Sequence, residues 1–275
     1  MDLRTFAKSY LPASVTGALR LAKYNYEIWS FPKTITTHRY GTSNFTVHIE
    51  DRVAKEWYDR DWELPHEIEF LASHGLRPGA LVFDLGAHQC VIAMMLAKQV
   101  GPDGRVVAVE ANRHNVRVAE RNFMTNRIVN VEVVHALISS KIGMDRAATS
   151  FNSRREGKVI ASDQVSALTI DRLAQSLGTP DVIYMDIEGF ELEALKGATN
   201  TLKRACTWFI ELHGDDMLTR YGASNHEILR YFSPDEFRAY VCGEDETAFH
   251  LLRGNPPHER CFMVFVPLRP GEPQV

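Results

Sequence analysis

Two apolar runs, each ending in an acidic residue, constrain the fold of this chain more than any other feature. The first run, 81–83, is followed by Asp84 and then by Gly86, and the second run, 106–109, is followed by Glu110. The helix-like segment between them makes this stretch a β-strand, a tight turn, a helix and a second β-strand. Because the carboxyl ends of parallel strands meet at one edge of a sheet, the two acids are expected to lie close together.

This arrangement predicts a nucleoside site. The glycine at the first turn, Gly86, lets the backbone approach a ligand closely, and the acid after the second strand can accept hydrogen bonds from both ribose hydroxyls. A dinucleotide pyrophosphate would favour a G-x-G-x-x-G turn, but this turn has a single glycine, and Asp84 would repel a phosphate. A cationic sulfonium suits the acidic pocket better, so S-adenosylmethionine is the predicted cofactor.

The alternation of strand and helix patterns continues well beyond this unit. We expect strands at 81–84, 105–109, 130–135, 181–186 and 206–212, and helices at 88–100, 113–125, 169–177, 190–204 and 224–231. Such alternation implies parallel strands joined by right-handed crossovers. A short strand at 237–242 follows, and the apolar runs 247–252 and 261–266 are typical of a closing antiparallel hairpin. The predicted fold class is α/β, with a Rossmann-like, doubly wound and mostly parallel sheet.

The length of 275 residues suits one principal domain with a small appendage. We place the principal domain at 76–270 and a leader that covers its pocket at 1–75. In the leader we expect an amphipathic helix around Val15–Tyr26, a short hairpin within 34–53 and a helix at 64–74.

Composition and charge narrow the partners and the compartment. The net charge of −4 gives no general attraction toward nucleic acid or an anionic membrane, so neither is a predicted partner. The four cysteines are widely spaced and form no C-x-x-C pair, which favours free thiols in a reducing cytoplasm. The segment 1–31 has no uninterrupted apolar stretch of membrane-spanning length. A homodimer through the N-terminal segment stays open, without a heptad or a large apolar stripe to support it.

Acidic side chains follow four of the predicted parallel strands, at the edge where ligands bind in an open α/β sheet. They are Asp84, Glu110, Asp186 with Glu188, and Glu211, which His213 follows closely. Two such carboxylates about 4 Å apart would repel each other by roughly 4 kcal/mol at an effective dielectric of about 20. A bound sulfonium, metal ion or basic substrate would offset this repulsion.

Other polar and aromatic residues have simpler expected roles. Glu191 and Glu193 are expected in a solvated first helical turn. The polar stretch 145–163 is expected to be a loop, whose length and position also suit an acceptor-binding lid. Three tryptophans are expected in the core or an interface: Trp57, Trp62 and Trp208.

A family resemblance emerges at the strand end Asp-Ile-Glu-Gly, residues 186–189. Together with Asp-Leu-Gly-Ala at 84–87 and Glu-Ala-Asn at 110–112, this turn resembles the FkbM-type family of S-adenosylmethionine-dependent methyltransferases over about residues 76–213. The resemblance implies a class I, seven-stranded methyltransferase sheet. It also implies, most commonly, O-methylation of a sugar or polyketide hydroxyl.

The resemblance and the strand-end positions together assign residues to both halves of the site. The residues expected to bind the cofactor are Asp84, Gly86, Ala87, His88, Glu110, Ala111 and Ala136. The residues expected to be catalytic are Asp186, Glu188 and His213, and Glu211 matches the acid that ends the next strand. The family's cofactor loop usually reads D-x-G-A-N-x-G, whereas His88 and Cys90 stand at its Asn and last Gly positions.

Methyl transfer is an in-line displacement at a carbon that the sulfonium already activates, so the protein mainly aligns the acceptor and removes its proton. Asp186 is the first candidate for the base by position. His213 is the second, because an imidazole with a pKa of about 6.5 accepts protons at neutral pH. A divalent metal ion on Asp186, Glu188 and Glu211 could acidify the hydroxyl, but no metal is predicted.

The predicted function is an S-adenosylmethionine-dependent O-methyltransferase that acts on a hydroxyl of a carbohydrate, a glycan or another secondary metabolite. Two alternatives stay open: an NAD-dependent oxidoreductase on a similar sheet, and a non-catalytic protein that binds the nucleoside. The missing pyrophosphate glycines and Asp84 disfavour the first alternative. The altered loop at His88 and Cys90 makes the second conceivable.

Overall fold

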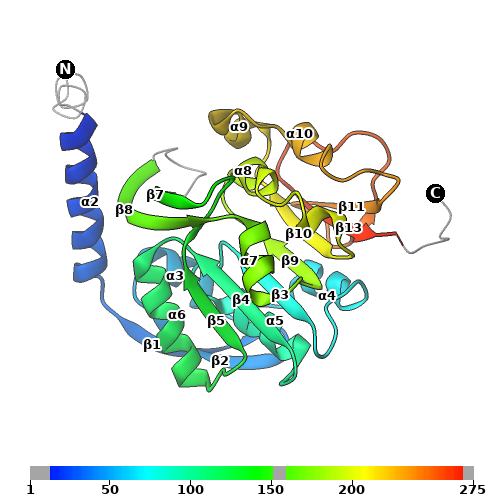
Figure 1. The fold of residues 1–275 in the computed structure, drawn as a ribbon. Helices are drawn as coiled ribbons and strands as arrows, with labels where there is room; N and C mark the ends of the chain where they lie inside the picture. The colour runs from blue at the N-terminus through cyan, green and yellow to red at the C-terminus, as the bar shows by residue number, and fades with distance from the viewer. Residues whose placement is uncertain (1–12, 151–158, 269–275) are drawn as a thin grey trace.

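The structure is a computed structural model that describes the backbone of residues 13–150 and 159–268. Its main sheet has the strand order β12-β11-β13-β10-β9-β3-β4-β5 (Figure 1). In chain order these strands are β3 (Leu81–Leu85), β4 (Arg105–Glu110), β5 (Val131–His135), β9 (Val182–Met185), β10 (Thr207–Leu212), β11 (Phe237–Gly243), β12 (His250–Leu251) and β13 (Cys261–Pro267). Strands β5, β4, β3, β9 and β10 are parallel neighbours, which confirms the predicted doubly wound, mostly parallel α/β fold.

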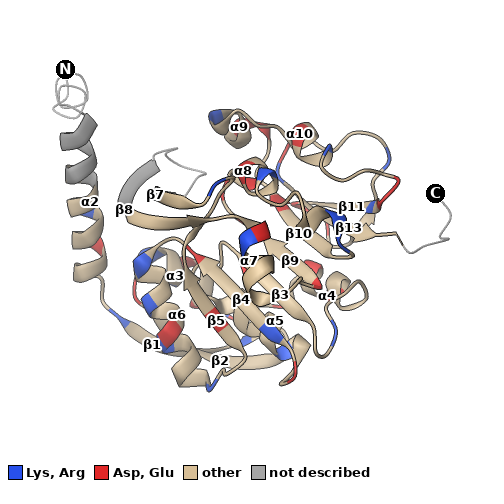
Figure 2. Ribbon diagram, viewed as in Figure 1, with Lys and Arg blue, Asp and Glu red and all other residues tan. Residues whose placement is uncertain are grey.

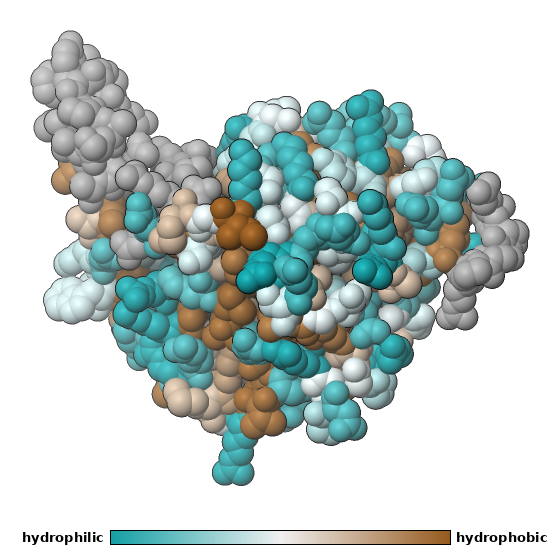
Figure 3. Space-filling model, viewed as in Figure 1, coloured by the Kyte–Doolittle hydropathy of each residue, from teal (hydrophilic) through white to brown (hydrophobic). Residues whose placement is uncertain are grey.

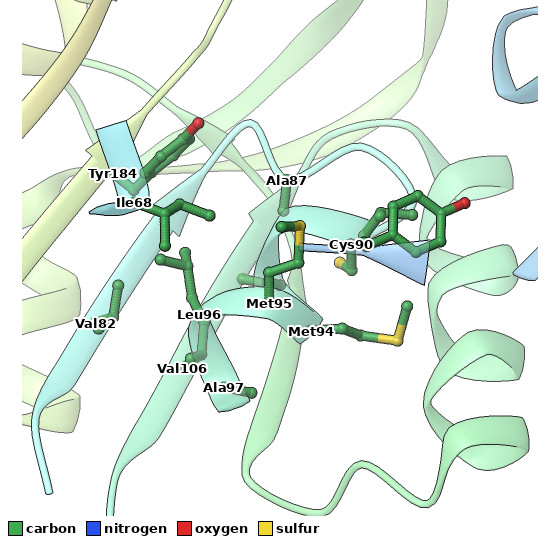
Figure 4. Packing of buried hydrophobic residues seen from close by; sticks show 14 of the residues in the cluster. Ile68, Val82, Ala87, Cys90, Met94, Met95, Leu96, Ala97, Val106 and Tyr184 are labelled. Carbon is green, nitrogen blue, oxygen red and sulfur yellow. The ribbon is translucent and has the colours of Figure 1, made fainter. Parts of the chain in front are cut away.

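The parallel strands are buried on both faces, and alternate side chains contribute to two hydrophobic clusters. Val82 and Val106 belong to the first cluster, part of which Figure 4 shows, while Phe83 and Val107 belong to the second. Because the side chains of a strand point alternately to opposite faces, the two clusters are the two sides of the sheet.

The helices between the strands cover both sides. The first cluster includes residues of α5 (Val91–Val100) and α6 (Arg113–Asn126), and the second includes residues of α7 (Ile170–Leu177), α8 (Glu191–Lys196) and α10 (Asn225–Leu229). The helix expected at 190–204 ends early, because Gly197 caps α8. The remaining short helices are η1 (Thr201–Lys203), α9 (Asp215–Leu218) and η2 (Thr219–Tyr221).

The antiparallel end of the sheet differs from the predicted hairpin. Strand β13 lies between β10 and β11 and is antiparallel to both. Because both edges of β13 are occupied, the two-residue β12 pairs with the outer edge of β11 instead. The prediction that 247–252 pairs with 261–266 was wrong, and the described sheet has eight strands rather than seven because of this short β12.

A second sheet occupies the stretch where a loop was expected. It consists of β6 (Leu137–Ile138), β7 (Gly143–Ser150) and β8 (Val159–Leu168), with β7 and β8 antiparallel. Just past the expected loop, Val165 and Ala167 are buried on either side of exposed Ser166, which is the period-two pattern of a strand. The loop prediction was wrong for the described part, and residues 151–158 lie outside the described residues.

The leader contributes to the same core as the sheet. It comprises α2 (Ala13–Ser30), the antiparallel hairpin of β1 (Thr34–Tyr40) and β2 (Ser43–Ile49), α3 (Arg52–Tyr58) and α4 (His66–Ala72), of which only α3 was not expected. Asp51 caps α3 by accepting a hydrogen bond from the Ala54 amide at 2.8 Å, a role that aspartate often has. Phe45 and Ile49 lie in the first hydrophobic cluster with Val82, so the hairpin packs against the parallel sheet. The boundary at residue 75 stays a prediction.

The cysteines and tryptophans lie in or against the core. All four cysteines are buried free thiols. Trp208 is fully buried, while Trp57 and Trp62 are partly buried against the first cluster. These residues therefore have the structural roles that were expected of them.

The surface combines charged, polar and scattered apolar side chains. Lys and Arg are interspersed with Asp and Glu along the elements in Figure 2, and Figure 3 shows a mostly hydrophilic face with scattered apolar patches. On α2, the described side chains of Leu19, Tyr26 and Trp29 are apolar and exposed. The homodimer through this segment stays a prediction. Within residues 13–150 and 159–268, no helix is long and apolar enough to cross a membrane.

Candidate active site

The carboxyl ends of β3, β4, β9 and β10 bring the predicted acids to one edge of the sheet. Asp84, Glu110 and Glu211 are almost fully buried, with exposed fractions of 2%, 8% and 6%. Burial, and then the charges of nearby Asp186 and Glu110, raise the pKa of Asp84 to about 8. These strand ends therefore form one acidic site, as their positions in the sequence predicted.

The first turn of the site depends on a glycine. Gly86 has a φ of +89°, and a Cβ at this position would lie 1.8 Å from the carbonyl oxygen of Asp186. The Gly86 amide donates to the carbonyl of Val109 at 2.9 Å. The turn is thus held between the ends of β4 and β9, where only glycine leaves room for the close approach.

Two non-glycine residues in the next turn have left-handed backbones. His88 has a φ of +49° and Cys90 a φ of +62°. These are the positions where the family resemblance places Asn and Gly, the residue types that adopt this conformation most easily. The Cys90 side chain is fully buried and packs in the first hydrophobic cluster with Ala87 and Met94 (Figure 4). The departures of this chain from the family's loop therefore carry backbone strain.

The leader holds this loop through α3. His88 Nδ1 and the Tyr58 hydroxyl share a hydrogen bond of 2.9 Å, and burial lowers the pKa of His88 to about 4, which keeps the imidazole neutral. At the start of α3, the Asp51 carboxylate accepts a hydrogen bond from the Gln89 side chain at 2.5 Å. The same carboxylate is hydrogen-bonded to His114 Nε2 at 2.8 Å. The leader therefore packs directly on the loop that was predicted to bind the cofactor.

Glu110 is surrounded by protein donors. Its carboxylate accepts hydrogen bonds from the amides of His88 at 2.8 Å and Asn112 at 2.6 Å, and from the Asn115 side chain at 3.4 Å. Burial nevertheless raises the pKa of Glu110 to about 7. Asn112 also donates to the Tyr24 hydroxyl of α2 at 2.8 Å. The contacts of Asn112, Asn115 and Tyr24 were not predicted, although an asparagine directly before a helix is a recognisable N-cap.

The alanines expected to bind the cofactor lie beside this acid. Ala87 donates its amide to the carbonyl of Val109 at 3.1 Å, and Ala136 donates its amide to the carbonyl of Glu110 at 3.1 Å. Ala111 follows Glu110 directly and is partly exposed. The predicted cofactor-binding residues thus gather at the ends of β3, β4 and β5.

The carboxylate of Asp84 is less well satisfied than that of Glu110. Asp84 Oδ2 is buried and makes no hydrogen bond to any residue that the structure describes. A cationic group would satisfy this oxygen and stabilise the ionised carboxylate. Asp84 and Glu110 therefore fit an adenosyl ligand that carries both a ribose and a positive charge.

The other half of the site is a group of side chains that we call the strand-end cluster: Asp186, Glu188, Glu191, Glu211 and His213. His213 Nε2 lies 3.5 Å from Asp186 Oδ1, 3.5 Å from Glu188 Oε2 and 3.7 Å from Glu211 Oε1. His213 Nδ1 is hydrogen-bonded to Glu191 Oε1 at 2.9 Å. The structure thus brings together the three residues that were predicted to be catalytic.

Glu191 does not lie in a solvated helical turn, so that expectation was wrong. Its exposed fraction is 0%, and its Oε1 also accepts a hydrogen bond from the Gly189 amide at 3.0 Å. These two partners allow a carboxylate to be buried at the start of α8. Glu193, by contrast, is partly exposed and pairs with Lys196 at 2.5 Å.

Burial and charge act in opposite directions on this cluster. Burial raises the pKa of Asp186 and of Glu188. Burial alone would lower the pKa of His213, but its hydrogen bond to Glu191 and the charges of the surrounding carboxylates raise it to about 10. In this arrangement the imidazole favours its protonated form, which differs from the neutral base expected from an ordinary histidine pKa.

Two neighbours of the cluster were not predicted. Arg260 pairs with Glu211 from the loop before β13, and a separation of 49 residues leaves no local sequence signal. Tyr221 packs closely on the turn after β9: its ring lies so near Gly189 that a Cβ on this glycine would be only 2.8 Å away. In the same turn Glu188 has a φ of +55°. Strained non-glycine residues of this kind cluster at functional sites.

The fold and the site together define a class of protein. A doubly wound sheet with an antiparallel strand inserted at one end, and with acids at the ends of its parallel strands, is the class I methyltransferase architecture. The model of the Methyltransferase FkbM domain family matches residues 84–242, which is more than half of the chain. The chain belongs to the FkbM family of methyltransferase domains.

Solved structures resemble the chain at low sequence identity. An FkbM methyltransferase from Methylobacillus flagellatus is 20% identical with a TM-score of 0.44, over 72% of this chain and 50% of that one. An S-adenosylmethionine-dependent O-methyltransferase from Thermotoga maritima is 13% identical with a TM-score of 0.45, over 88% and 80%. An S-adenosylmethionine-dependent methyltransferase from Aquifex aeolicus is 18% identical with a TM-score of 0.42, over 79% and 93%. The chain thus spans about half the length of the M. flagellatus protein, and no curated protein matched it significantly.

Proposed function

We propose that this protein is an S-adenosylmethionine-dependent O-methyltransferase that methylates a hydroxyl of a carbohydrate, a glycan or another secondary metabolite. The observation that carries the proposal is that the two halves of the site share one edge of the sheet. Asp84 and Glu110 form the nucleoside end, and Asp186 of the strand-end cluster lies close enough for its charge to act on Asp84. An acceptor at the cluster would therefore lie next to the charged end of a bound methyl donor.

The residues of the nucleoside end have distinct roles in this proposal. When bound, S-adenosylmethionine supplies a methyl group that its sulfonium has already activated. Glu110 accepts hydrogen bonds from the ribose, and the Gly86 turn lets the backbone approach the ligand. Asp84 faces the positive charge through its buried Oδ2. Ala111 and Ala136 present small side chains to the adenine on either side of Glu110.

At the strand-end cluster, the chain aligns the acceptor and takes its proton. Asp186 is the proposed base, since its Oδ1 is buried and makes no hydrogen bond to any described residue. Glu188 and His213 orient the hydroxyl, because His213 Nε2 lies 3.5 Å from both Asp186 and Glu188. The β7–β8 hairpin, which follows Ala136 through β6, is the proposed acceptor-binding element.

Ligand binding tests the proposal first. Thermal unfolding of the protein should shift upward with S-adenosylmethionine and with S-adenosylhomocysteine, because both would bind the folded state, and should not shift with NAD. The absence of a shift with either sulfur ligand would contradict the proposal. A shift with NAD alone would favour an oxidoreductase.

Methyl transfer is the second test. The protein is incubated with methyl-labelled S-adenosylmethionine and a broad panel of hydroxylated metabolites and glycans, and we expect label in at least one acceptor. Cofactor binding without transfer to any acceptor in the panel would favour a non-catalytic nucleoside-binding protein.

A further inference from the structure

We propose that the strand-end cluster binds a divalent cation, with Asp186, Glu211 and His213 as its ligands. Potential ligand atoms of these three residues all lie within 4.8 Å of one another. The role of the cation, which is to hold the acceptor hydroxyl, rests on the proposed function. Its binding can be measured without any methyl transfer.

Buried ligand atoms converge in the cluster without partners. Asp186 Oδ1, Glu188 Oε2 and His213 Nε2 are each buried and make no hydrogen bond to the residues that the structure describes. The His213 side chain is only 1% exposed, so bulk water does not solvate it. A buried polar atom without a partner is costly, and several that converge indicate a ligand that satisfies them together.

The spacing of these atoms fits a coordination shell better than a hydrogen-bond network. His213 Nε2 lies 3.5, 3.5 and 3.7 Å from oxygens of Asp186, Glu188 and Glu211. These separations exceed the roughly 2.7–3.2 Å of an N–H···O hydrogen bond. Atoms bound about 2.0–2.2 Å from one ion lie about 2.8–3.6 Å apart at octahedral or tetrahedral angles. The two separations of 3.5 Å fall in this range and the separation of 3.7 Å lies just above it, as expected of neighbouring ligands around one ion.

Glu191 fixes the imidazole for this role. Its Oε1 is hydrogen-bonded to His213 Nδ1 at 2.9 Å and accepts a second hydrogen bond from the Gly189 amide at 3.0 Å. In metal sites, a carboxylate on the far nitrogen sets the tautomer in which Nε2 coordinates, and a divalent ion displaces the proton that Nε2 carries in its absence. Glu191 is thus a positioning residue rather than a ligand.

The charge and the donor types favour a particular kind of cation. The cluster has four carboxylates, and Arg260 pairs with one of them, Glu211. A divalent ion would offset the remaining repulsion between Asp186 and Glu188. One imidazole nitrogen among carboxylate oxygens suits a first-row transition ion such as Mn²⁺ better than Ca²⁺ or Mg²⁺, which prefer oxygen ligands alone.

The cation changes the division of labour in the cluster. Asp186 becomes a ligand, and Glu188 is the carboxylate that remains to take the proton. The acceptor hydroxyl binds the ion through its oxygen, which lowers the pKa of the hydroxyl. Its O–H bond breaks and the proton passes to Glu188, while the oxygen forms the new bond to the methyl carbon. The electron pair of the broken carbon–sulfur bond stays on sulfur.

The test uses the full chain, freed of metal with a chelator and titrated with Mn²⁺, whose free form is measured by electron paramagnetic resonance. We expect one Mn²⁺ per chain and, in the pulsed spectrum of the wild-type protein, coupling to a histidine nitrogen. His213→Gln and Glu211→Gln should each weaken Mn²⁺ affinity at least about tenfold, and Glu191→Gln about 10–100-fold. Glu193→Gln is the matched control, because it changes a partly exposed acid of the same helix as Glu191, and it should keep wild-type affinity.

Thermal unfolding and S-adenosylhomocysteine binding show whether each variant is folded. The proposal is overturned if the wild-type protein binds no Mn²⁺, if the nitrogen coupling is absent, or if folded variants keep wild-type affinity. If the variants do not fold, the nitrogen coupling in the wild-type protein is sufficient to test whether His213 is a ligand. Methyl transfer that persists in chelated protein would contradict the proposed cation and support the proposed function. Mn²⁺ binding without any methyl transfer would support the cation site and contradict the proposed function.

Discussion

The two halves of the site differ in how far the protein satisfies their buried carboxylates. At the nucleoside end, Glu110 accepts hydrogen bonds from His88, Asn112 and Asn115, and only Asp84 keeps a buried carboxylate oxygen that no described residue satisfies. In the strand-end cluster, Asp186 and Glu188 each keep a buried oxygen that no described residue satisfies. The nucleoside end is therefore organised largely by the protein, whereas the acceptor end requires a ligand to complete it.

Asp186→Asn should break the acceptor end and spare the nucleoside end. Loss of this carboxylate, as base or as ligand, should lower kcat by about 10²–10⁴-fold, while affinity for S-adenosylhomocysteine changes little. Transfer of labelled methyl groups and calorimetric titration measure the two quantities. Asp103→Asn, in an exposed turn, is the control and should change neither. An equal loss of activity and affinity would argue against two separate halves.

Gly86→Ala tests the contact that joins the two halves. The new Cβ would lie 1.8 Å from the Asp186 carbonyl oxygen, on a backbone with a φ of +89°. We expect the free energy of unfolding to fall by about 3 kcal/mol, from overpacking and backbone strain together. Urea denaturation measures this loss.

Gly79→Ala is the matched control for that variant. Gly79 has a φ of +81°, but no described heavy atom outside its chain neighbours lies within 4 Å of the added Cβ. Only the backbone cost of about 1–2 kcal/mol should remain. Equal losses in the two variants would mean that the close approach to Asp186 is not what requires Gly86.

Glu110→Gln should lower the affinity for the cofactor, which is the quantity that Asp186→Asn leaves unchanged. The amide cannot replace a carboxylate that accepts from both backbone amides and the ribose, so we expect cofactor affinity to fall about 10–100-fold, from a loss of about 1.5–3 kcal/mol. Titration with S-adenosylhomocysteine measures this loss. Glu132→Gln changes a half-exposed acid on neighbouring β5 and should leave affinity unchanged. A loss of activity with unchanged cofactor affinity would show that Glu110 acts at the acceptor end rather than at the nucleoside end.

The accuracy of sequence-based prediction differs between the strand ends and the contacts that surround them. Asp84, Gly86 and Glu110 belong to one continuous segment that runs from β3 through α5 to β4. Local periodicity and turn chemistry were therefore enough to predict that these residues lie close together. The inward position of Glu191 and the pairing of Arg260 with Glu211 depend on contacts between distant segments. No local pattern marks such contacts, and none marks the hydrogen bonds of Asn115 to Glu110 and of Asn112 to Tyr24 either. In both halves the sequence therefore predicted the residues at the strand ends better than the partners that surround them.

The same distinction explains the errors in the fold. The five parallel strands follow from regular alternation of apolar runs and helices. The insertion of β13 between β10 and β11 depends on which sheet edge is free, and the β7–β8 hairpin pairs backbone groups in a stretch of polar composition. Backbone pairing of this kind leaves little trace in hydrophobic periodicity.

The pH dependence of cofactor binding should follow the nucleoside end. Burial raises the pKa of Glu110 to about 7, so the carboxylate that the ribose requires forms as the pH passes this value. If the ionised form binds, cofactor affinity should rise roughly tenfold between about pH 6 and pH 8. Glu110→Gln should flatten this rise in calorimetric titrations, and a rise that survives the substitution would assign it to another group.

Stability without cofactor should change in the opposite direction. A pKa raised in the folded state means that the folded protein binds more protons than the unfolded chain between the two pKa values. The contribution of Glu110 is therefore present in full below about pH 4.5 and is lost as the pH rises to about 7. Urea denaturation across this range should show the fall in the wild-type protein and a smaller fall in Glu110→Gln.

Cys90 should give the smallest effect, and it tests the strain in the loop of the nucleoside end. Its backbone is left-handed, with a φ of +62° at the N-cap of α5, and its side chain is fully buried. Cys90→Ala removes the thiol but keeps a Cβ in the left-handed region, whereas Cys90→Gly removes both. Glycine within a helix is usually less stable than alanine by about 0.5–1 kcal/mol. Here the relief of strain should make the glycine variant the more stable one by about 1 kcal/mol in urea denaturation. A more stable alanine variant would mean that side-chain burial, rather than backbone strain, governs this position.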